Sequence, residues 1–74
     1  MAVTESALMP HERLTDREFE VLRAIGRGKT VSRIAHDMGL SIKTVSTYRT
    51  RLLEKMQLAT TSDLIRYSID HALV

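Results

Sequence analysis

This sequence contains no cysteine and no tryptophan, and its aromatic residues are limited to two tyrosines and one phenylalanine. Without cysteine it can form neither a disulfide framework nor a thiolate metal site. It lacks an apolar run near the ~18 residues of a membrane-spanning helix, and its N-terminus lacks the pattern of a secretory signal. We therefore expect a cytoplasmic protein without a cofactor. Its 74 residues suffice for one domain with a small core.

Positive charge is concentrated in the middle of the chain, although the formal net charge is only +2. Residues 27–55 hold seven basic and two acidic residues, a net charge of +5, whereas the remainder holds four basic and seven acidic residues, a net charge of −3. A solvated basic face is the commoner origin of such a cluster. A surface that binds nucleic acid produces the same asymmetry, so charge alone leaves both interpretations open.

Hydrophobic periodicity and capping residues predict an all-α chain in which a leader precedes one helical domain. Residues 1–13 show no period, and Pro10 prevents a continuous helix, so we expect a flexible leader or linker there and the domain over residues 14–74. Thr15 and Glu18 form a capping-box pattern, and other threonine, serine and glycine residues mark the remaining helix ends. The expected helices cover residues 16–27, 31–38, about 42–56, and a last segment from Thr60 to the end of the chain.

The third predicted helix follows the second after a tight turn that contains Gly39. A short helix, a glycine-containing turn and a longer helix with a basic, polar face together indicate a helix-turn-helix unit. At ~100° per residue, the apolar and polar positions of the longer helix fall on roughly opposite faces. The apolar face consists of Val45, Leu52, Leu53 and Met56, and the polar face of Lys43, Ser46, Thr47, Thr50 and Glu54.

The composition of this polar face favours DNA over an ordinary amphipathic surface helix, which is the alternative. Serine and threonine are poor helix formers at exposed positions, but they can approach base edges and thymine methyl groups closely. Lys43 and Thr44 lie in the first turn, where the helix N-terminus favours a phosphate. Tyr48, Arg49 and Arg51 flank the face at angles suited to the sugar-phosphate backbone.

The last predicted helix carries more apolar residues than one packing stripe needs. End-of-chain packing and contact with a second copy of the chain both account for this surplus. Our candidates for a dimer contact are Tyr67, Ile69 and His71.

Other motifs in the sequence do not support catalysis or metal binding. The segment G-R-G-K-T at residues 26–30 resembles the end of a phosphate-binding loop, but Arg23 occupies the position of the first glycine and the segment follows a helix. His11, His36 and His71 lack the spacing of metal ligands. No hydroxyl has an adjacent base, so we do not expect an enzyme.

Several sequence elements occur together at characteristic spacings: L-T-x-R-E-x-E-V-L from Leu14, Gly28, I-A at residues 34–35, L-S-x-K-T-V from Leu40, and Lys55 followed by methionine in place of the usual leucine. With them the chain resembles the LuxR/NarL/FixJ family of bacterial transcription factors, the GerE-like helix-turn-helix, from Leu14 to about His71. The segment K-T-V-S-T-Y-R-T-R-L is similar to the response-regulator branch.

This resemblance implies a four-helix LuxR-type domain whose third helix lies in the DNA major groove and whose fourth helix often pairs two copies. The chain departs from the family pattern at two places. In the second helix, Val31 stands where the family usually has Asn and Arg33 where an acid is common, so this helix loses its capping-box partner and gains a candidate phosphate contact. In the third helix, several relatives carry Lys where this chain has Ser46 and Thr50. Carried over by position, the base contacts are Lys43, Ser46, Thr47 and Thr50, and the phosphate contacts are Thr44, Tyr48, Arg49 and Arg51.

We therefore expect sequence-specific binding of double-stranded DNA by the effector domain of a bacterial transcriptional regulator, of the two-component response-regulator type. A free-standing small regulator has much the same length and stays an alternative. The expected partners are DNA, a second copy bound through the C-terminal helix, and RNA polymerase as a further candidate, with no membrane and no small-molecule ligand. The rival hypothesis is a helical interaction module that binds polymerase or another regulator through its fourth helix and does not bind DNA.

Overall fold

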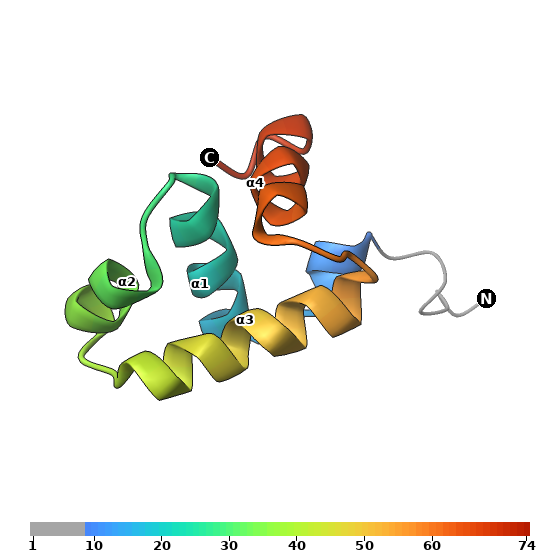
Figure 1. Cartoon of the computed structure of the whole chain (residues 1–74). Helices are drawn as coiled ribbons and strands as arrows, with labels where there is room; N and C mark the ends of the chain where they lie inside the picture. The colour runs from blue at the N-terminus through green and yellow to red at the C-terminus, as the bar shows by residue number, and fades with distance from the viewer. Residues whose placement is uncertain (1–8) are drawn as a thin grey trace.

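The computed structural model describes residues 9–74, which form one short 3-10 helix and four α-helices and contain no β-strand. The predicted all-α fold is confirmed. None of the helices in this part of the chain is long and apolar enough to cross a membrane. The elements are η2 (Pro10–Arg13), α1 (Asp16–Gly26), α2 (Val31–Met38), α3 (Ile42–Met56) and α4 (Thr61–Asp70), shown in Figure 1.

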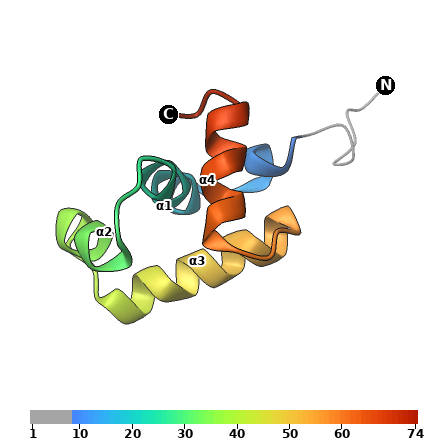
Figure 2. The ribbon, with the colours of Figure 1, turned by 45° about the horizontal axis from the view of Figure 1, so that its top comes forward.

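The hydrophobic core lies where α1 meets the other three helices. α1 contacts α4, α3 and α2, and α2 also contacts α3. Both views of the ribbon show α3 along one edge of the molecule with the other α-helices on the same side of it (Figures 1 and 2). The opposite side of α3 is therefore left uncovered by the fold. The core residues are Val21, Leu22, Ile25, Ile34, Ala35, Val45, Leu52, Met56 and Leu64.

Hydroxyl side chains cap all four α-helices at the predicted positions. Thr15 Oγ1 accepts a hydrogen bond from the backbone N–H of Glu18 at 3.2 Å, and Ser41 Oγ accepts one from that of Thr44 at 3.0 Å. Each bond satisfies a backbone donor that has no partner within its own helix. Thr30 and Thr60 cap α2 and α4 in the same way. The helix starts could be predicted because this chemistry is local.

The last helix ends earlier than the sequence predicts. It stops at Asp70, and Ala72 has a positive φ of 55° that turns the chain back. The backbone N–H of Leu73 then donates to the Ser68 carbonyl at 2.8 Å, while the Leu73 carbonyl accepts from Arg23 Nε at 3.0 Å. The C-terminal residues are thus fixed against α1 and do not extend the helix.

Part of the expected leader belongs to the folded domain. Residues 1–8 lie outside the part that the structure describes, but Pro10 begins η2, which contacts α3. His11 Nδ1 lies 2.7 Å from the Tyr67 hydroxyl in α4, and the backbone N–H of His11 donates to the same oxygen at 3.3 Å. Proline is well suited to a first helical position because its fixed φ is helical. The folded unit therefore begins before the expected boundary at Leu14.

Candidate nucleic-acid interface

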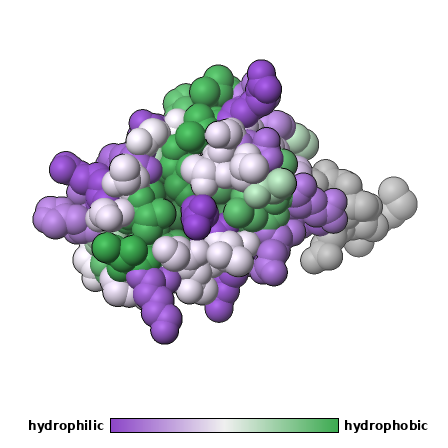
Figure 3. Space-filling view, viewed as in Figure 1, coloured by the Kyte–Doolittle hydropathy of each residue, from purple (hydrophilic) through white to green (hydrophobic). Residues whose placement is uncertain are grey.

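The uncovered side of α3 is polar and basic, as the sequence predicts. Val45, Leu52 and Met56 are buried against the other helices, while Leu53 is half-buried. The space-filling view shows hydrophilic side chains projecting away from the edge along which α3 runs (Figure 3). We call the exposed residues Lys43, Thr47, Thr50 and Glu54, together with the half-buried Ser46, the reading face.

Two hydroxyls of the reading face are bonded to the helix itself. Thr47 Oγ1 donates to the Lys43 carbonyl at 3.0 Å, and Thr50 Oγ1 donates to the Ser46 carbonyl at 3.1 Å. Bonds of this kind to the carbonyl four residues earlier are common for threonine within helices. The sequence predicts that these side chains approach base edges, and the structure shows that each hydroxyl hydrogen already has a partner.

The N-terminus of α3 offers a donor beside the reading face. Ser41 Oγ donates to Thr44 Oγ1 at 2.9 Å while it accepts from the Thr44 backbone. The Thr44 hydroxyl thus receives a hydrogen bond, and its own hydrogen has no recorded acceptor within residues 9–74. The backbone N–H groups of the first turn that lack a partner within the helix point outward from the same N-terminal end. This end of α3 is suited to a negatively charged oxygen.

The predicted phosphate contacts Tyr48, Arg49 and Arg51 do not lie together. Arg51 is exposed and forms no ion pair within the described residues, but Tyr48 is half-buried and packs against the core. Arg49 Nη1 donates to Thr61 Oγ1 in α4 at 3.1 Å, and its Nε is buried. Because Arg49 follows Thr47 by two residues, it lies ~200° around the helix. Its position therefore favours a contact between α3 and α4 over a contact beside the reading face.

Lys55, the last residue of the basic segment 27–55, is held by an acid. Its Nζ donates to Glu18 Oε1 at 2.8 Å, and the same oxygen accepts from the Thr15 backbone N–H at 2.9 Å. Burial raises the pKa of Glu18, but the hydrogen bonds from Lys55 and Thr15 outweigh it, so the pKa lies below its ordinary value. Glu18 thus closes the predicted capping box and also links the start of α1 to the end of α3.

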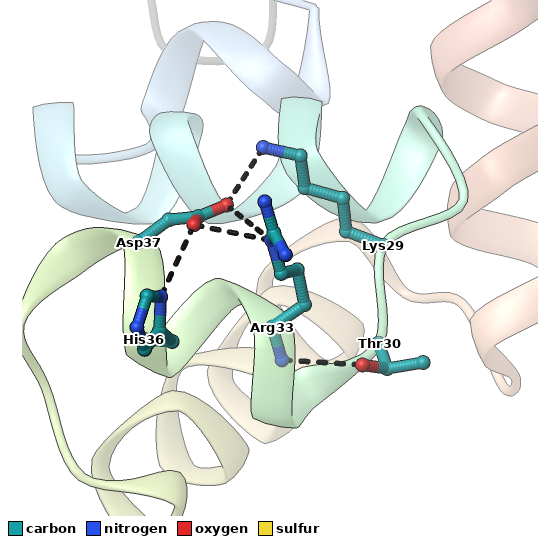
Figure 4. A network of polar contacts seen from close by, with 5 residues as sticks. All are labelled: Lys29, Thr30, Arg33, His36 and Asp37. Atoms are coloured by element: carbon teal, nitrogen blue, oxygen red, sulfur yellow. Dashed lines mark hydrogen bonds and ion pairs between the residues drawn. The ribbon is translucent and has the colours of Figure 1, made fainter.

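Asp37 in α2 is the centre of a charged cluster that the sequence reasoning missed (Figure 4). Its carboxylate lies 2.9 Å from Lys29 Nζ, 3.2 Å from Arg33 Nε and 3.6 Å from His36 Nδ1. The hydrogen bond from Lys29 and the nearby positive charges lower the pKa of Asp37. The spacing of Arg33 and Asp37, four residues apart, was a signal that could have revealed part of this cluster.

The three candidate dimer residues lie on two different sides of α4. Tyr67 and His71 are half-buried, with stacked rings 3.9 Å apart, and the His11 ring packs against both. Ile69 is 61% exposed and lies 160–200° around the helix from them. The three residues therefore cannot form one contact surface. The exposed side of α4 instead combines Ile69 with Ser62, Ile65, Arg66 and Asp70, which line a shallow depression.

The histidines do not assemble a metal site within the described residues. His11 and His71 lie together, with ring centroids 5.8 Å apart, but no group of three or more potential ligands occurs in residues 9–74. The segment G-R-G-K-T forms the end of α1 and the loop before α2, where Lys29 is paired with Asp37.

Comparison with known proteins relates the chain to bacterial regulators. Residues 12–68 match the family described as bacterial regulatory proteins, luxR family. The chain is 40% identical to transcriptional regulatory protein LiaR of Bacillus subtilis over 95% of this chain and 33% of that protein. It is 39% identical to transcriptional regulatory protein MctR of Rhizobium johnstonii over 82% of this chain and 28% of that protein. For response regulator UvrY of Escherichia coli the identity is 32% over 93% of this chain. The chain spans about a third of the length of these relatives.

Proposed function

Because this chain belongs to the luxR family of bacterial regulatory proteins, we propose that it binds double-stranded DNA at specific sequences, with α3 in the major groove. The observation that carries this proposal is the reading face, an uncovered, polar helix surface whose other side is fixed in the core. An α-helix fits the major groove of B-form DNA, where each base pair presents a distinct pattern of donors, acceptors and methyl groups.

The candidate residues divide into three groups by their positions. Lys43, Ser46, Thr47 and Thr50 lie on the reading face and contact base edges. Thr44 at the start of α3 and the exposed Arg51 contact phosphates, because Thr44 offers a hydroxyl donor and Arg51 a cation that forms no ion pair within residues 9–74. Tyr48 and Arg49 act chiefly in packing and in the link to α4. Lys43 also contributes to the electrostatic attraction.

A titration of the protein against duplex DNA at about 50 and 200 mM salt tests this function, because phosphate contacts make the affinity fall steeply with salt. We expect salt-sensitive binding that weakens in Arg51→Ala. Arg66→Ala, which removes an exposed arginine from α4, is the matched control and leaves binding to a short, single-site duplex unchanged. If the protein bound no duplex in a salt-dependent manner, the rival hypothesis of a helical interaction module would be favoured.

We further propose that the chain acts as the effector domain of a response regulator within a longer protein, supported by the relative that is named a response regulator. Phosphorylation of a receiver domain would then control dimerisation or release of this domain. Treating the longer protein with a small phosphodonor should raise its affinity for DNA. An affinity that does not respond would contradict control of this domain by phosphorylation.

A second copy of the chain binds through the exposed side of α4. Ile65 and Ile69 supply apolar surface, and Arg66 and Asp70 on the same side supply opposite charges that a two-fold contact can pair. We expect a monomer at low concentration and a dimer on a duplex with two half-sites, measured by sedimentation. Ile69→Glu should abolish the dimer but leave binding to one half-site intact. A strict monomer on the duplex with two half-sites would contradict this role of α4.

A further inference from the structure

The threonines of the reading face have no hydroxyl hydrogen left to offer a base. Thr47 Oγ1 donates its hydrogen to the Lys43 carbonyl at 3.0 Å, and Thr50 Oγ1 donates its hydrogen to the Ser46 carbonyl at 3.1 Å. A hydroxyl has one hydrogen. Unless these bonds break, neither side chain can donate to an acceptor such as guanine O6, guanine N7 or thymine O4.

Each threonine keeps its methyl group for contact with DNA, and its hydroxyl oxygen can still accept a hydrogen bond but cannot donate one. The two other substituents on its Cβ are a methyl group and a hydrogen, and the oxygen is directed at the preceding helical turn by its bond to the backbone. Both residues are exposed. Lys43, Thr47 and Thr50 follow the spacing i, i+4, i+7 and so form one stripe along α3. Along this stripe the helix presents one cationic donor followed by two methyl groups.

We propose that Thr47 and Thr50 select thymine by packing their methyl groups against its 5-methyl group, while Lys43 supplies the donor for an acceptor base such as guanine. This inference rests on the proposed binding of DNA by α3. The 5-methyl group of thymine is the one methyl group that A·T and G·C base pairs present in the major groove. Selection at Thr47 and Thr50 therefore comes from burial of methyl groups and not from hydroxyl hydrogen bonds.

Paired substitutions at each threonine separate the two modes of selection. Valine keeps the methyl group and the shape of threonine but removes the hydroxyl, whereas serine keeps the hydroxyl and removes the methyl group. We expect Thr50→Val to retain the affinity and the thymine preference of the wild type. Thr50→Ser should lose the preference at one position, and the same pair at Thr47 should act at another. Because both positions are exposed on α3, all four variants should fold, which their helical circular dichroism would verify.

The test uses a duplex selected from a random pool by the wild-type protein. Each thymine is replaced in turn by uracil, which removes the 5-methyl group and leaves base pairing unchanged. Loss of one buried methyl contact should lower the affinity about fourfold, at one or two thymines in the site and at none outside it. Thr50→Ser should bind the thymine and uracil duplexes equally at its own position.

Two outcomes would overturn the inference while leaving DNA binding by α3 intact. One is full, salt-dependent binding that is indifferent to uracil at every thymine. The other is a Thr50→Val variant that loses as much affinity as Thr50→Ser, which would mean that the hydroxyl bonds a base, either by leaving the Ser46 carbonyl or by accepting from a base amino group. Failure of the wild type to bind any duplex would overturn both proposals and is distinguished from these outcomes by the salt titration.

Discussion

Glu18 and Lys55 join the start of α1 to the end of α3, and replacing Glu18 with glutamine tests what this contact contributes to stability. The Glu18 side chain is only 3% exposed, and Oε1 accepts from Lys55 Nζ at 2.8 Å and from the Thr15 backbone N–H at 2.9 Å. Glutamine has nearly the same shape and keeps an acceptor for the capping box, but it carries no charge. The change therefore isolates the contribution of the charge.

The expected loss at neutral pH is about 1–2 kcal/mol in the free energy of unfolding. Hydrogen bonds to charged groups contribute about 1.5–3 kcal/mol and neutral ones about 0.5–1.5 kcal/mol, so the bond from the Thr15 N–H weakens by roughly 1 kcal/mol. Lys55 keeps its charge, so its bond loses only the attraction between the two charges, about 0–1 kcal/mol. The Lys55 side chain is 41% exposed, and screening by solvent reduces the share of that bond.

The loss should depend on pH in a defined direction. The pKa of Glu18 is lowered from its ordinary value of 4.5, since the bonds from Lys55 and Thr15 outweigh the effect of burial. A carboxylate whose pKa is lower in the folded state stabilises the fold above its unfolded pKa and loses this contribution as the pH falls through its folded pKa. The difference between wild type and Glu18→Gln should therefore be largest at neutral pH and shrink below pH 4.5.

Urea denaturation at about pH 7 and at several values below about pH 4.5 provides the measurement. Glu20→Gln is the matched control, because Glu20 lies on the same helix but has a side chain that is 59% exposed. Its ion pair, between Oε2 and Arg17 Nη1 at 3.7 Å, is also exposed to solvent. We expect a change below about 0.5 kcal/mol for this control. An equal loss for both variants, or a loss for Glu18→Gln that did not diminish at low pH, would refute the reasoning.

Three further substitutions test the packing, a helix end and the interface. Gly26→Ala should lower stability by about 1–3 kcal/mol in thermal denaturation, since a Cβ there would lie 2.6 Å from Ser68 Cβ, and an unchanged melting temperature would contradict this close approach. Gln57→Gly should raise stability by roughly 0.5–1 kcal/mol in urea denaturation, because Gln57 ends α3 with φ 54°, which favours glycine; a lower midpoint would show that the side chain matters more than the backbone. Lys43→Ala should reduce the slope of log affinity against log salt by about 1, and an unchanged slope would exclude an electrostatic contribution.

Much of the fold could be predicted because its signals are local. The capping residues Thr15, Thr30, Ser41 and Thr60 each bond the backbone three positions onward, so a short stretch of sequence contains both partners. The same holds for the buried and exposed faces of α3, which follow from helical periodicity. The left-handed end of α3 at Gln57 was not predicted, since nothing in a glutamine indicates a positive φ.

The details of the candidate site depend on contacts that are distant in sequence or set by a side-chain rotamer. Arg49 was placed beside the phosphates, but the direction of its side chain depends on Thr61 in the next helix. His11 was assigned to a leader because its partner Tyr67 lies 56 residues away. Thr50 was placed among the base contacts, although its rotamer directs its hydroxyl to the helix backbone. Residue types alone specify none of these three contacts.

The most direct test of the central claim is to map the backbone amide signals whose chemical shifts change when the ¹⁵N-labelled protein binds a short duplex with one site. If α3 reads the major groove, the largest changes in chemical shift will occur at the start of α3 and along its reading face, from Ser41 to Arg51. The exposed side of α4 around Ile69 will remain unchanged, because a single site admits no second copy. Changes confined to α4, with the reading face unaffected, would contradict the proposed function.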